Sequence, residues 1–176
     1  AAHLCDPGTG RVLTSAASSN PQRNLGEDVI ARISYCQDHA EGTEMLHRLV
    51  CQEVCTLVDA CLKRLSAHPD DVDDVSVVGN TTMVELFLGI NPQALGRHPY
   101  RPVTCSPVDC RAEDLGLAPI RDATVYVLPV VSGFIGGDTI GAVLSQRPHG
   151  GAAITLIVDI GTNGEIVLGN RQRLLC

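Results

Sequence analysis

The stretch ITLIVDIGTNGE, residues 154–165, decides the fold. Its first five residues are apolar or β-branched, which predicts a buried strand that ends at Val158. Asp159 follows this strand, and the glycines after it let the backbone pass close to a ligand. A threonine hydroxyl and successive backbone N–H groups then offer a concave set of donors that suits a phosphate. Asp159 can hold hydrated Mg²⁺, because this ion keeps waters and takes one or two carboxylates beside nucleotide phosphates.

The same stretch also has an ordinary interpretation, since Gly-Thr-Asn-Gly suits a hairpin turn. Two further strand-to-glycine transitions favour phosphate binding. VGNTTM, residues 78–83, starts a helix directly after a predicted strand, an arrangement that binds anions. SGFIGGD, residues 132–138, follows a predicted strand at 124–128 and places Asp138 in the first turn of a helix. Plain helix capping, by Asn80 or Thr81 in the first case, is the alternative for both.

The remaining pattern predicts alternating strands and helices. Residues 3–19 predict a hairpin with its turn at 6–10, and apolar spacing predicts helices over 26–36 and 43–67, the second capped by Thr43. The proline-rich residues 91–123 are expected to form irregular surface structure. Alternation of this kind is typical of an α/β fold with parallel strands, and the final strand–turn–strand predicts a mixed sheet.

Composition restricts the class of protein. The net charge of −7 argues against a nucleic-acid partner, and no apolar stretch is long enough for a membrane span. Eight cysteines could form a disulfide framework, but reduced, buried thiols in a cytoplasmic protein fit this large aliphatic core better. His47, Cys51 and Cys55 lie on one helix flank and could be part of a metal site, although buried cysteine is the better explanation.

Five blocks of sequence occur in a particular order along the chain. They are NPQ with GEDVIARI (20–22 and 26–33), VGNTTM (78–83), LGINP (88–92), SGFIGGD (132–138) and DIGTNGE (159–165). This series resembles the reductive activators of corrinoid proteins, which are ATP-dependent, iron–sulfur-containing proteins of the actin-like superfamily. The resemblance covers nearly the whole chain.

The resemblance implies an actin-like, ribonuclease H-like ATPase lobe of the α/β class, with a mixed sheet flanked by helices and present incompletely. Residues 1–150 would be a first lobe without its first phosphate-turn strand, and residues 151–176 the first hairpin of a second lobe. The implied activity is ATP-dependent reduction of a corrinoid protein from Co(II) to Co(I), the state needed for methyl transfer. ATP and Mg²⁺ are the implied cofactors, and an iron–sulfur cluster is expected outside this chain.

The resemblance also implies roles for residues. Asp159 and Asp138 are expected to be catalytic, Asp159 holding Mg²⁺ through water and Asp138 facing it from the other lobe, where it would orient water or metal. The residues expected to bind nucleotide are Gly161, Thr162, Asn163, Gly164, Gly136, Gly137, Asn80 and Thr81. A corrinoid protein and a nucleotide are the expected partners.

Other functions remain open on the sequence. A small-molecule kinase or the ATPase that activates acyl-CoA dehydratases would share the fold, and Asp138 could then serve as a catalytic base. A lobe that only docks a corrinoid protein is the non-enzymatic alternative, and the chain alone is expected to be inactive. An exposed edge strand at the C-terminal end also predicts a homodimer.

Overall fold

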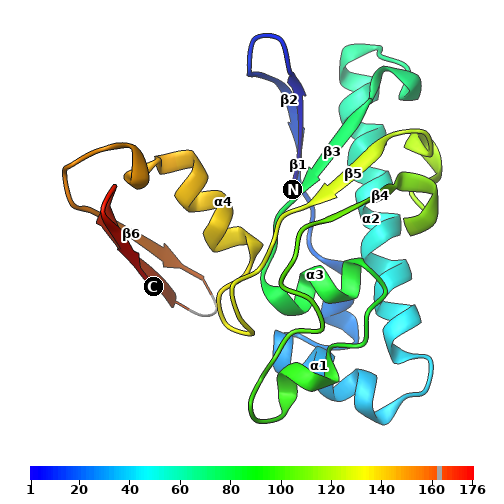
Figure 1. Cartoon of the computed structure of the whole chain (residues 1–176). Coiled ribbons are helices and arrows are strands. Elements are labelled where there is room, and N and C mark those ends of the chain that lie inside the picture. The colour runs from blue at the N-terminus through cyan, green and yellow to red at the C-terminus, as the bar shows by residue number, and fades with distance from the viewer. Residues whose placement is uncertain (162–163) are drawn as a thin grey trace.

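The computed structural model describes residues 1–161 and 164–176, which form three small sheets with helices around them (Figure 1). The strands are β1 (Ala2–Asp6), β2 (Arg11–Ala16), β3 (Asp74–Val77), β4 (Val108–Arg111), β5 (Thr124–Val127), β6 (Thr155–Ile160), β7 (Gly164–Asn170) and β8 (Arg173–Leu175). The α-helices are α1 (Val29–Asp38), α2 (Gly42–Leu65), α3 (Thr81–Phe87) and α4 (Gly137–Gln146). The fold is therefore of the mixed α/β class that the sequence predicts.

The central sheet has the strand order β3-β5-β4, and α2 runs along one of its faces (Figure 1). β3 and β5 are parallel, whereas β4 pairs with β5 in the antiparallel direction. Val125 and Val127 of β5 are almost completely buried, and they pack in one cluster with Cys51 of α2 and Phe87 of α3. This apolar cluster fixes the carboxyl ends of the two parallel strands at one edge of the sheet.

The predicted N-terminal hairpin is confirmed. β1 and β2 pair in the antiparallel direction, and Asp6 closes the turn by accepting hydrogen bonds from the backbone of Gly8 and the hydroxyl of Thr9. Its base packs on α2, where Ala16 contacts the buried Leu57 and Cys61. The tip extends away from the body of the molecule (Figure 1).

The prediction of irregular surface structure over residues 91–123 is wrong in part. This segment contains β4 and several short 3₁₀ turns, and five of its side chains are buried in the main cluster: Ala112, Leu115, Leu117, Ile120 and Ala123. β4 has only four residues, and its side chains alternate between apolar and polar, as suits a strand at the edge of the sheet. The prolines interrupt the chain between these elements, but they do not keep it out of the core.

The block at residues 20–33 has structural roles. Gln22 is fully buried, and its amide donates a 2.8 Å hydrogen bond to the carbonyl of Leu46 in α2. Gly26 leaves space for Arg32, because a Cβ at residue 26 would lie 2.7 Å from the backbone nitrogen of Arg32. Asp28 accepts a hydrogen bond from the third residue of α1 and is its N-cap, whereas the sequence placed it inside the helix. The block therefore anchors α1 and α2.

Helix α2 begins one residue earlier than expected, and Thr43 is not its cap. The N-cap position is Glu41, whose side chain makes no capping bond. Gly42 is the first helical residue because it packs on α1, where a Cβ would come within 2.9 Å of the carbonyl oxygen of Tyr35. The close contact between α1 and α2 therefore explains the glycine at this position, and no capping hydroxyl is present at the start of α2.

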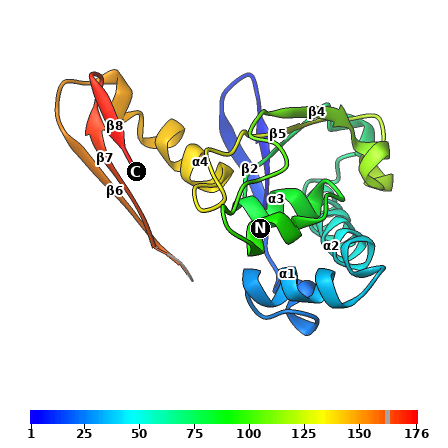
Figure 2. The same cartoon turned by 60° about the horizontal axis from the view of Figure 1, so that its bottom comes forward.

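The C-terminal part of the chain forms a separate antiparallel sheet, β6-β7-β8, which α4 separates from the rest (Figures 1 and 2). The prediction that β6 is a buried strand is wrong. Leu156 and Val158 are 59% and 50% exposed, and they share one open face with their cross-strand partners Leu168 and Ile166. The other face, which carries Ile157 and Asp159, is turned toward α4 and is half-buried.

Candidate functional site

Two of the three glycine-rich turns meet at the carboxyl edge of the central sheet. Because β3 and β5 are parallel neighbours, the turns that follow them, at residues 78–81 and 132–138, leave the sheet side by side. The backbone nitrogen of Asp138 donates a 3.2 Å hydrogen bond to the carbonyl of Gly79. The hydroxyl of Thr81 donates a 2.7 Å hydrogen bond to the carbonyl of Ser132. The structure therefore brings together segments that are about fifty residues apart.

The side chains of Asn80 and Thr81 serve the fold. The amide oxygen of Asn80 accepts a hydrogen bond from the backbone of Met83 and so caps α3. Thr81 is 2% exposed, and its hydroxyl is used in the contact with Ser132. For these two residues the structure favours the capping interpretation over direct contact with a ligand.

The glycine at residue 136 is explained by a contact between two turns, whereas the sequence suggests a contact with nucleotide. A Cβ at residue 136 would lie 2.6 Å from the Cα of Asn80 and 2.8 Å from the carbonyl oxygen of Gly79. The glycine thus allows the two turns to touch each other. Gly137 is less restricted, since its nearest contacts would be at the ordinary distance of 3.5 Å. Both residues are buried and position the start of α4.

Three carboxylates lie near enough to one another, at the start of α4 and on the β6–β7 hairpin, for their charges to interact. Asp138 lies in the first turn of α4, and Asp159 and Glu165 are direct partners on β6 and β7. Partial burial, followed by the negative charges of Asp138 and Asp159, raises the pKa of Glu165. Like charges directly opposite on two strands are unfavourable, so a cation between them would stabilise this arrangement.

Glu165 is the functional candidate that sequence reasoning did not assign. The sequence contains a signal for Glu165, because a tight turn after Asp159 pairs Asp159 with the second or third residue of the return strand. Alternation then puts both carboxylates on the same face of the sheet. The structure identifies Glu165 as the partner of Asp159, because the register of β6 and β7 pairs these two residues.

The remaining residues expected in the phosphate turn are placed in part. Gly161 is exposed at the end of β6, and Gly164 opens β7, where a Cβ would meet only the carbonyl oxygen of Asp159, at 3.8 Å. Thr162 and Asn163 lie outside the described residues, and their roles stay predictions. Asp159 has the chemistry for hydrated Mg²⁺, which needs only one or two carboxylates. Among the described residues no three His, Cys, Asp or Glu side chains converge closely enough to enclose an ion on their own.

His47, Cys51 and Cys55 have separate structural environments. The Nδ1–H group of His47 donates a 2.9 Å hydrogen bond to the carbonyl of Phe87 and so ties α2 to α3. Burial, helped by neighbouring Cys55, raises the pKa of Cys51 to about 12, which keeps the thiol protonated. These observations favour core cysteines over metal ligands.

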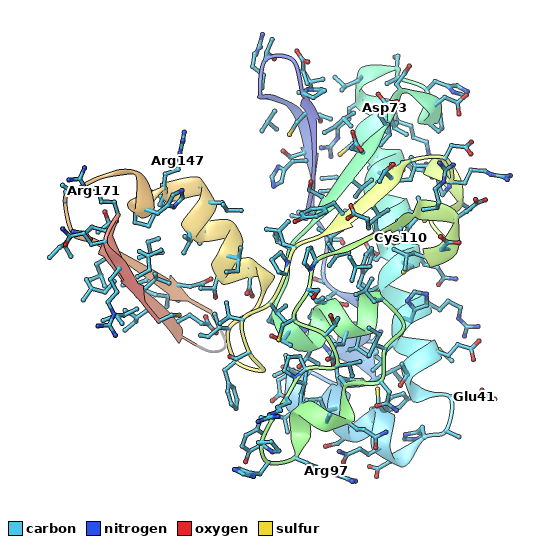
Figure 3. The ribbon with its side chains drawn as sticks, viewed as in Figure 1. Glu41, Asp73, Arg97, Cys110, Arg147 and Arg171 are labelled. Carbon is cyan, nitrogen blue, oxygen red and sulfur yellow. The ribbon has the colours of Figure 1, made fainter. Side chains whose placement is uncertain are left out.

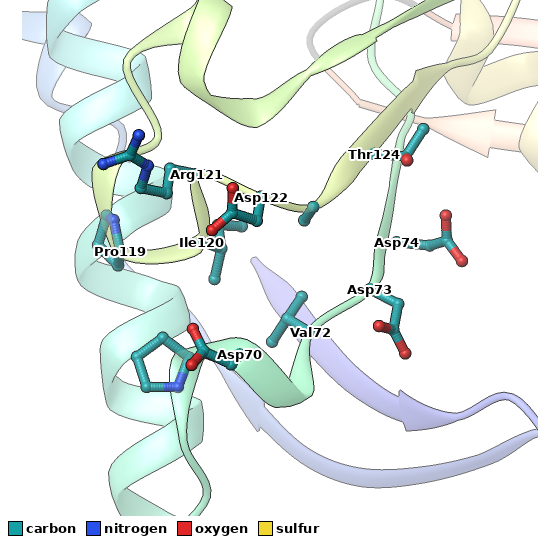
Figure 4. A pocket seen from close by; sticks show the side chains of 11 residues that line it. Asp70, Val72, Asp73, Asp74, Pro119, Ile120, Arg121, Asp122 and Thr124 are labelled. Atoms are coloured by element: carbon teal, nitrogen blue, oxygen red, sulfur yellow. The ribbon is translucent and has the colours of Figure 1, made fainter.

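A hollow of about 430 Å³ lies at the opposite, amino edge of the central sheet (Figure 4). Asp70, Asp73, Asp74 and Asp122 line it, so acidic side chains from residues 70–74 form one of its walls. Its charged residues are already partly paired, since Arg121 lies 3.6 Å from Glu113. The hollow shares no residue with the turns at the carboxyl edge.

The geometry thus defines an α/β protein whose polar site lies where two parallel strands end beside a carboxylate-bearing hairpin. The sequence profile of one family, described as the RACo middle region, matches residues 1–150. The chain belongs to this family.

Two relatives extend the comparison. The corrinoid activation enzyme RamQ of Eubacterium limosum is 32% identical over 168 residues, which is 96% of this chain and 28% of RamQ. The solved structure of a reductive activator for corrinoid, iron–sulfur protein superposes with a TM-score of 0.93 and 34% identity, over 98% of this chain and 28% of that one. The resemblance to reductive activators of corrinoid proteins is confirmed. The chain spans a little over a quarter of the length of these relatives.

No helix among the described residues is long and apolar enough to cross a membrane.

Proposed function

We propose that this chain forms part of the nucleotide-binding region of an ATP-dependent activator that reduces a corrinoid protein from Co(II) to Co(I). The observation that carries the proposal is that Asp159 and Glu165 are paired on β6 and β7 near the charge of Asp138, whose backbone is hydrogen-bonded to the turn that follows β3. The names of the two relatives, a corrinoid activation enzyme and a reductive activator, support the same function.

In this proposal residues 1–150 are a first lobe and residues 151–176 open a second one. The match to the RACo middle region ends at residue 150, and a new sheet begins with β6, which supports the division. Asp159, with Glu165 beside it, would hold the hydrated Mg²⁺ that accompanies the nucleotide phosphates. Asp138, in the first turn of α4, would orient a water molecule or a water ligand of the metal.

Reduction to Co(I) is energetically uphill, and ATP hydrolysis would supply the driving force. ATP with Mg²⁺ would bind beside Asp138 and Asp159, and the electron would come from an iron–sulfur cluster outside this chain, in the cytoplasm. The most buried cysteines of this chain, Cys36, Cys51 and Cys61, lie in the core and would not be ligands of that cluster.

Calorimetric titration of Mg²⁺·ATP tests the proposal. It compares this chain with a version extended at both ends toward the length of its relatives, and with Asp159→Asn in the extended version. We expect binding by the extended protein and a loss of at least about tenfold in affinity for the variant, since a charge-assisted contact is removed. Absence of binding by the extended wild type would refute nucleotide binding.

A docking lobe without catalysis is the second candidate function. It is favoured by Asn80 and Thr81, whose side chains are used for capping and packing rather than left free. Retained affinity for a corrinoid protein without any affinity for ATP would support it. A kinase or a dehydratase activator on the same fold would instead be recognised by its own substrate, a phosphorylated small molecule or a reactivated dehydratase.

The open face of β6-β7-β8 supports a homodimer as a further proposal for the isolated chain. Leu156, Val158 and Ile166 are exposed together on it, which favours self-association. Sedimentation would show a dimer, and a monomer at all concentrations would contradict this.

A further inference from the structure

An exposed apolar surface lies on two loops beside the candidate site and has no role in it. The loops are residues 97–105, which precede β4, and residues 131–135, which follow β5. The rings of Tyr100 and Phe134 lie 5.5 Å apart between centroids, and Phe134 is 68% exposed. Val103 and Val131 are exposed as well and complete what we call the Tyr100–Phe134 surface.

Contacts between the two loops, and with buried Glu85, hold the loops in place. A Cβ at Gly133 would lie only 2.2 Å from the carbonyl oxygen of Tyr100, so only glycine allows this contact. Glu85, which is 1% exposed, accepts a 2.6 Å hydrogen bond from the backbone of Val103. The thiol of Cys105 lies 3.9 Å from the carbonyl oxygen of Val131. The exposed side chains are therefore presented by an ordered support, which lowers the entropy cost of binding a partner.

The charge around this surface differs from that of the rest of the molecule. The chain has 20 acidic and 13 basic residues, yet residues 92–108 and 123–137 contain no aspartate or glutamate. They do contain Arg97 and Arg101, which are exposed and take part in none of the ion pairs among the described residues. Arg97 lies at the end of the molecule opposite the β1–β2 hairpin (Figure 3).

Aromatic side chains with arginine at their rim are the composition typical of protein interfaces. The positive rim is complementary to a partner that carries negative charge around an apolar centre. A chain with a net charge of −7 would repel such a partner over most of its surface, so the acid-free loops are where approach is most favourable.

We propose that the Tyr100–Phe134 surface docks the corrinoid protein through an acidic, partly apolar face of that partner. This inference rests on the proposed function. The surface is also joined to the site, because the segment that exposes Phe134 continues directly into Gly136 and Asp138. The hydroxyl of Thr81 holds the same segment at Ser132. Docking would thus act on the turn that positions Asp138.

The test measures affinity in the extended protein, with a purified corrinoid protein from the same cells as the probe. Phe134→Ala and Tyr100→Ala are expected to weaken binding by at least about tenfold, as for aromatic anchors at the centre of an interface. Arg101→Glu is expected to weaken it and to reduce its dependence on salt. Val12→Ala and Arg11→Glu, on the exposed tip of the distant hairpin, are matched controls that should bind like the wild type.

The outcomes separate this inference from the function on which it rests. If the wild type binds the corrinoid protein and the surface variants bind equally well, the docking surface is wrong and the proposed function stands. If the wild type does not bind, both are wrong. If Phe134→Ala lowers the affinity for ATP and leaves partner affinity unchanged, the surface belongs to the nucleotide and the inference is overturned. Unchanged circular dichroism would confirm that the variants are folded, as expected for exposed positions.

Discussion

The contact between the two turns at the carboxyl edge can be tested by adding one methyl group. In Gly136→Ala the new Cβ would lie 2.6 Å from the Cα of Asn80, 2.7 Å from Oδ1 of Asp138 and 2.8 Å from the carbonyl oxygen of Gly79. Two of these neighbours are backbone atoms of the segment that caps α3, so neither can rotate away. Either the turns separate or α4 shifts.

Overpacking of a well-packed contact costs typically about 1–3 kcal/mol, and three simultaneous close contacts place this variant near the upper end, at about 2–3 kcal/mol. For a protein of this size each kcal/mol lowers the melting temperature by about 2–4 °C, so the expected decrease is about 4–12 °C. The assay is thermal unfolding followed by circular dichroism.

Gly150→Ala is the matched control. A Cβ at residue 150 would have no neighbour within 4 Å, and its φ is not in the left-handed region. Replacing such a glycine reduces the entropy of the unfolded chain and stabilises a protein by about 0.4–1 kcal/mol. We expect Gly150→Ala to melt at or slightly above the wild-type temperature. If Gly136→Ala also melted within about 2 °C of wild type, less than 1 kcal/mol would be lost, and the two turns would not be in the described contact.

Three further predictions concern the scaffold. Burial raises the pKa of Glu85, so the stability that its neutral form contributes is complete below the ordinary pKa of 4.5 and is lost as the pH rises through the raised value. Melting temperatures over a pH series should therefore show Glu85→Gln gaining on the wild type as the pH rises, and a constant difference would contradict this. Cys51 is protonated and 3% exposed, so it should resist modification by iodoacetamide, whereas the exposed Cys105 should react. Mass spectrometry measures the labelling of each residue, and equal labelling of the two would refute the burial of Cys51 in α2. Asp28→Ala should destabilise the protein by about 1 kcal/mol in urea unfolding, because α1 loses its N-cap, and an unchanged midpoint would show that the cap contributes nothing.

The elements that sequence alone predicts well are those with strong local signals. The apolar run that becomes β5 and the glycine-rich turn into α4 are near their expected positions, because strand and turn composition differ sharply there. β4 was missed since Val108–Arg111 is short and half polar, and only its pairing with β5 makes it a strand. Its burial depends on contacts with residues distant in sequence, which a local pattern does not contain.

The roles that the sequence assigns to the candidate site residues stay predictions. The sequence identifies Asp138 and Asp159 as carboxylates that follow strands, and in the structure the charges of both act on Glu165. The sequence does not show whether a glycine makes room for a ligand or for a neighbouring turn. At Gly136 the structure shows that the glycine makes room for the turn at Gly79 and Asn80. The partnership of Asp159 with Glu165 depends on strand register, which a one-residue shift would have changed.

The most direct test of the proposed function is the spectroscopic measurement of Co(I) formation in a corrinoid protein under reducing conditions. The extended protein is supplied with an electron donor and is assayed with and without Mg²⁺·ATP, as wild type and as Asp159→Asn. We expect the wild type to produce Co(I) only with ATP, and Asp159→Asn to produce little or none at the same ATP concentration. Formation of Co(I) at equal rates with and without ATP, or by both proteins alike, would contradict the claim that this site couples ATP to corrinoid reduction.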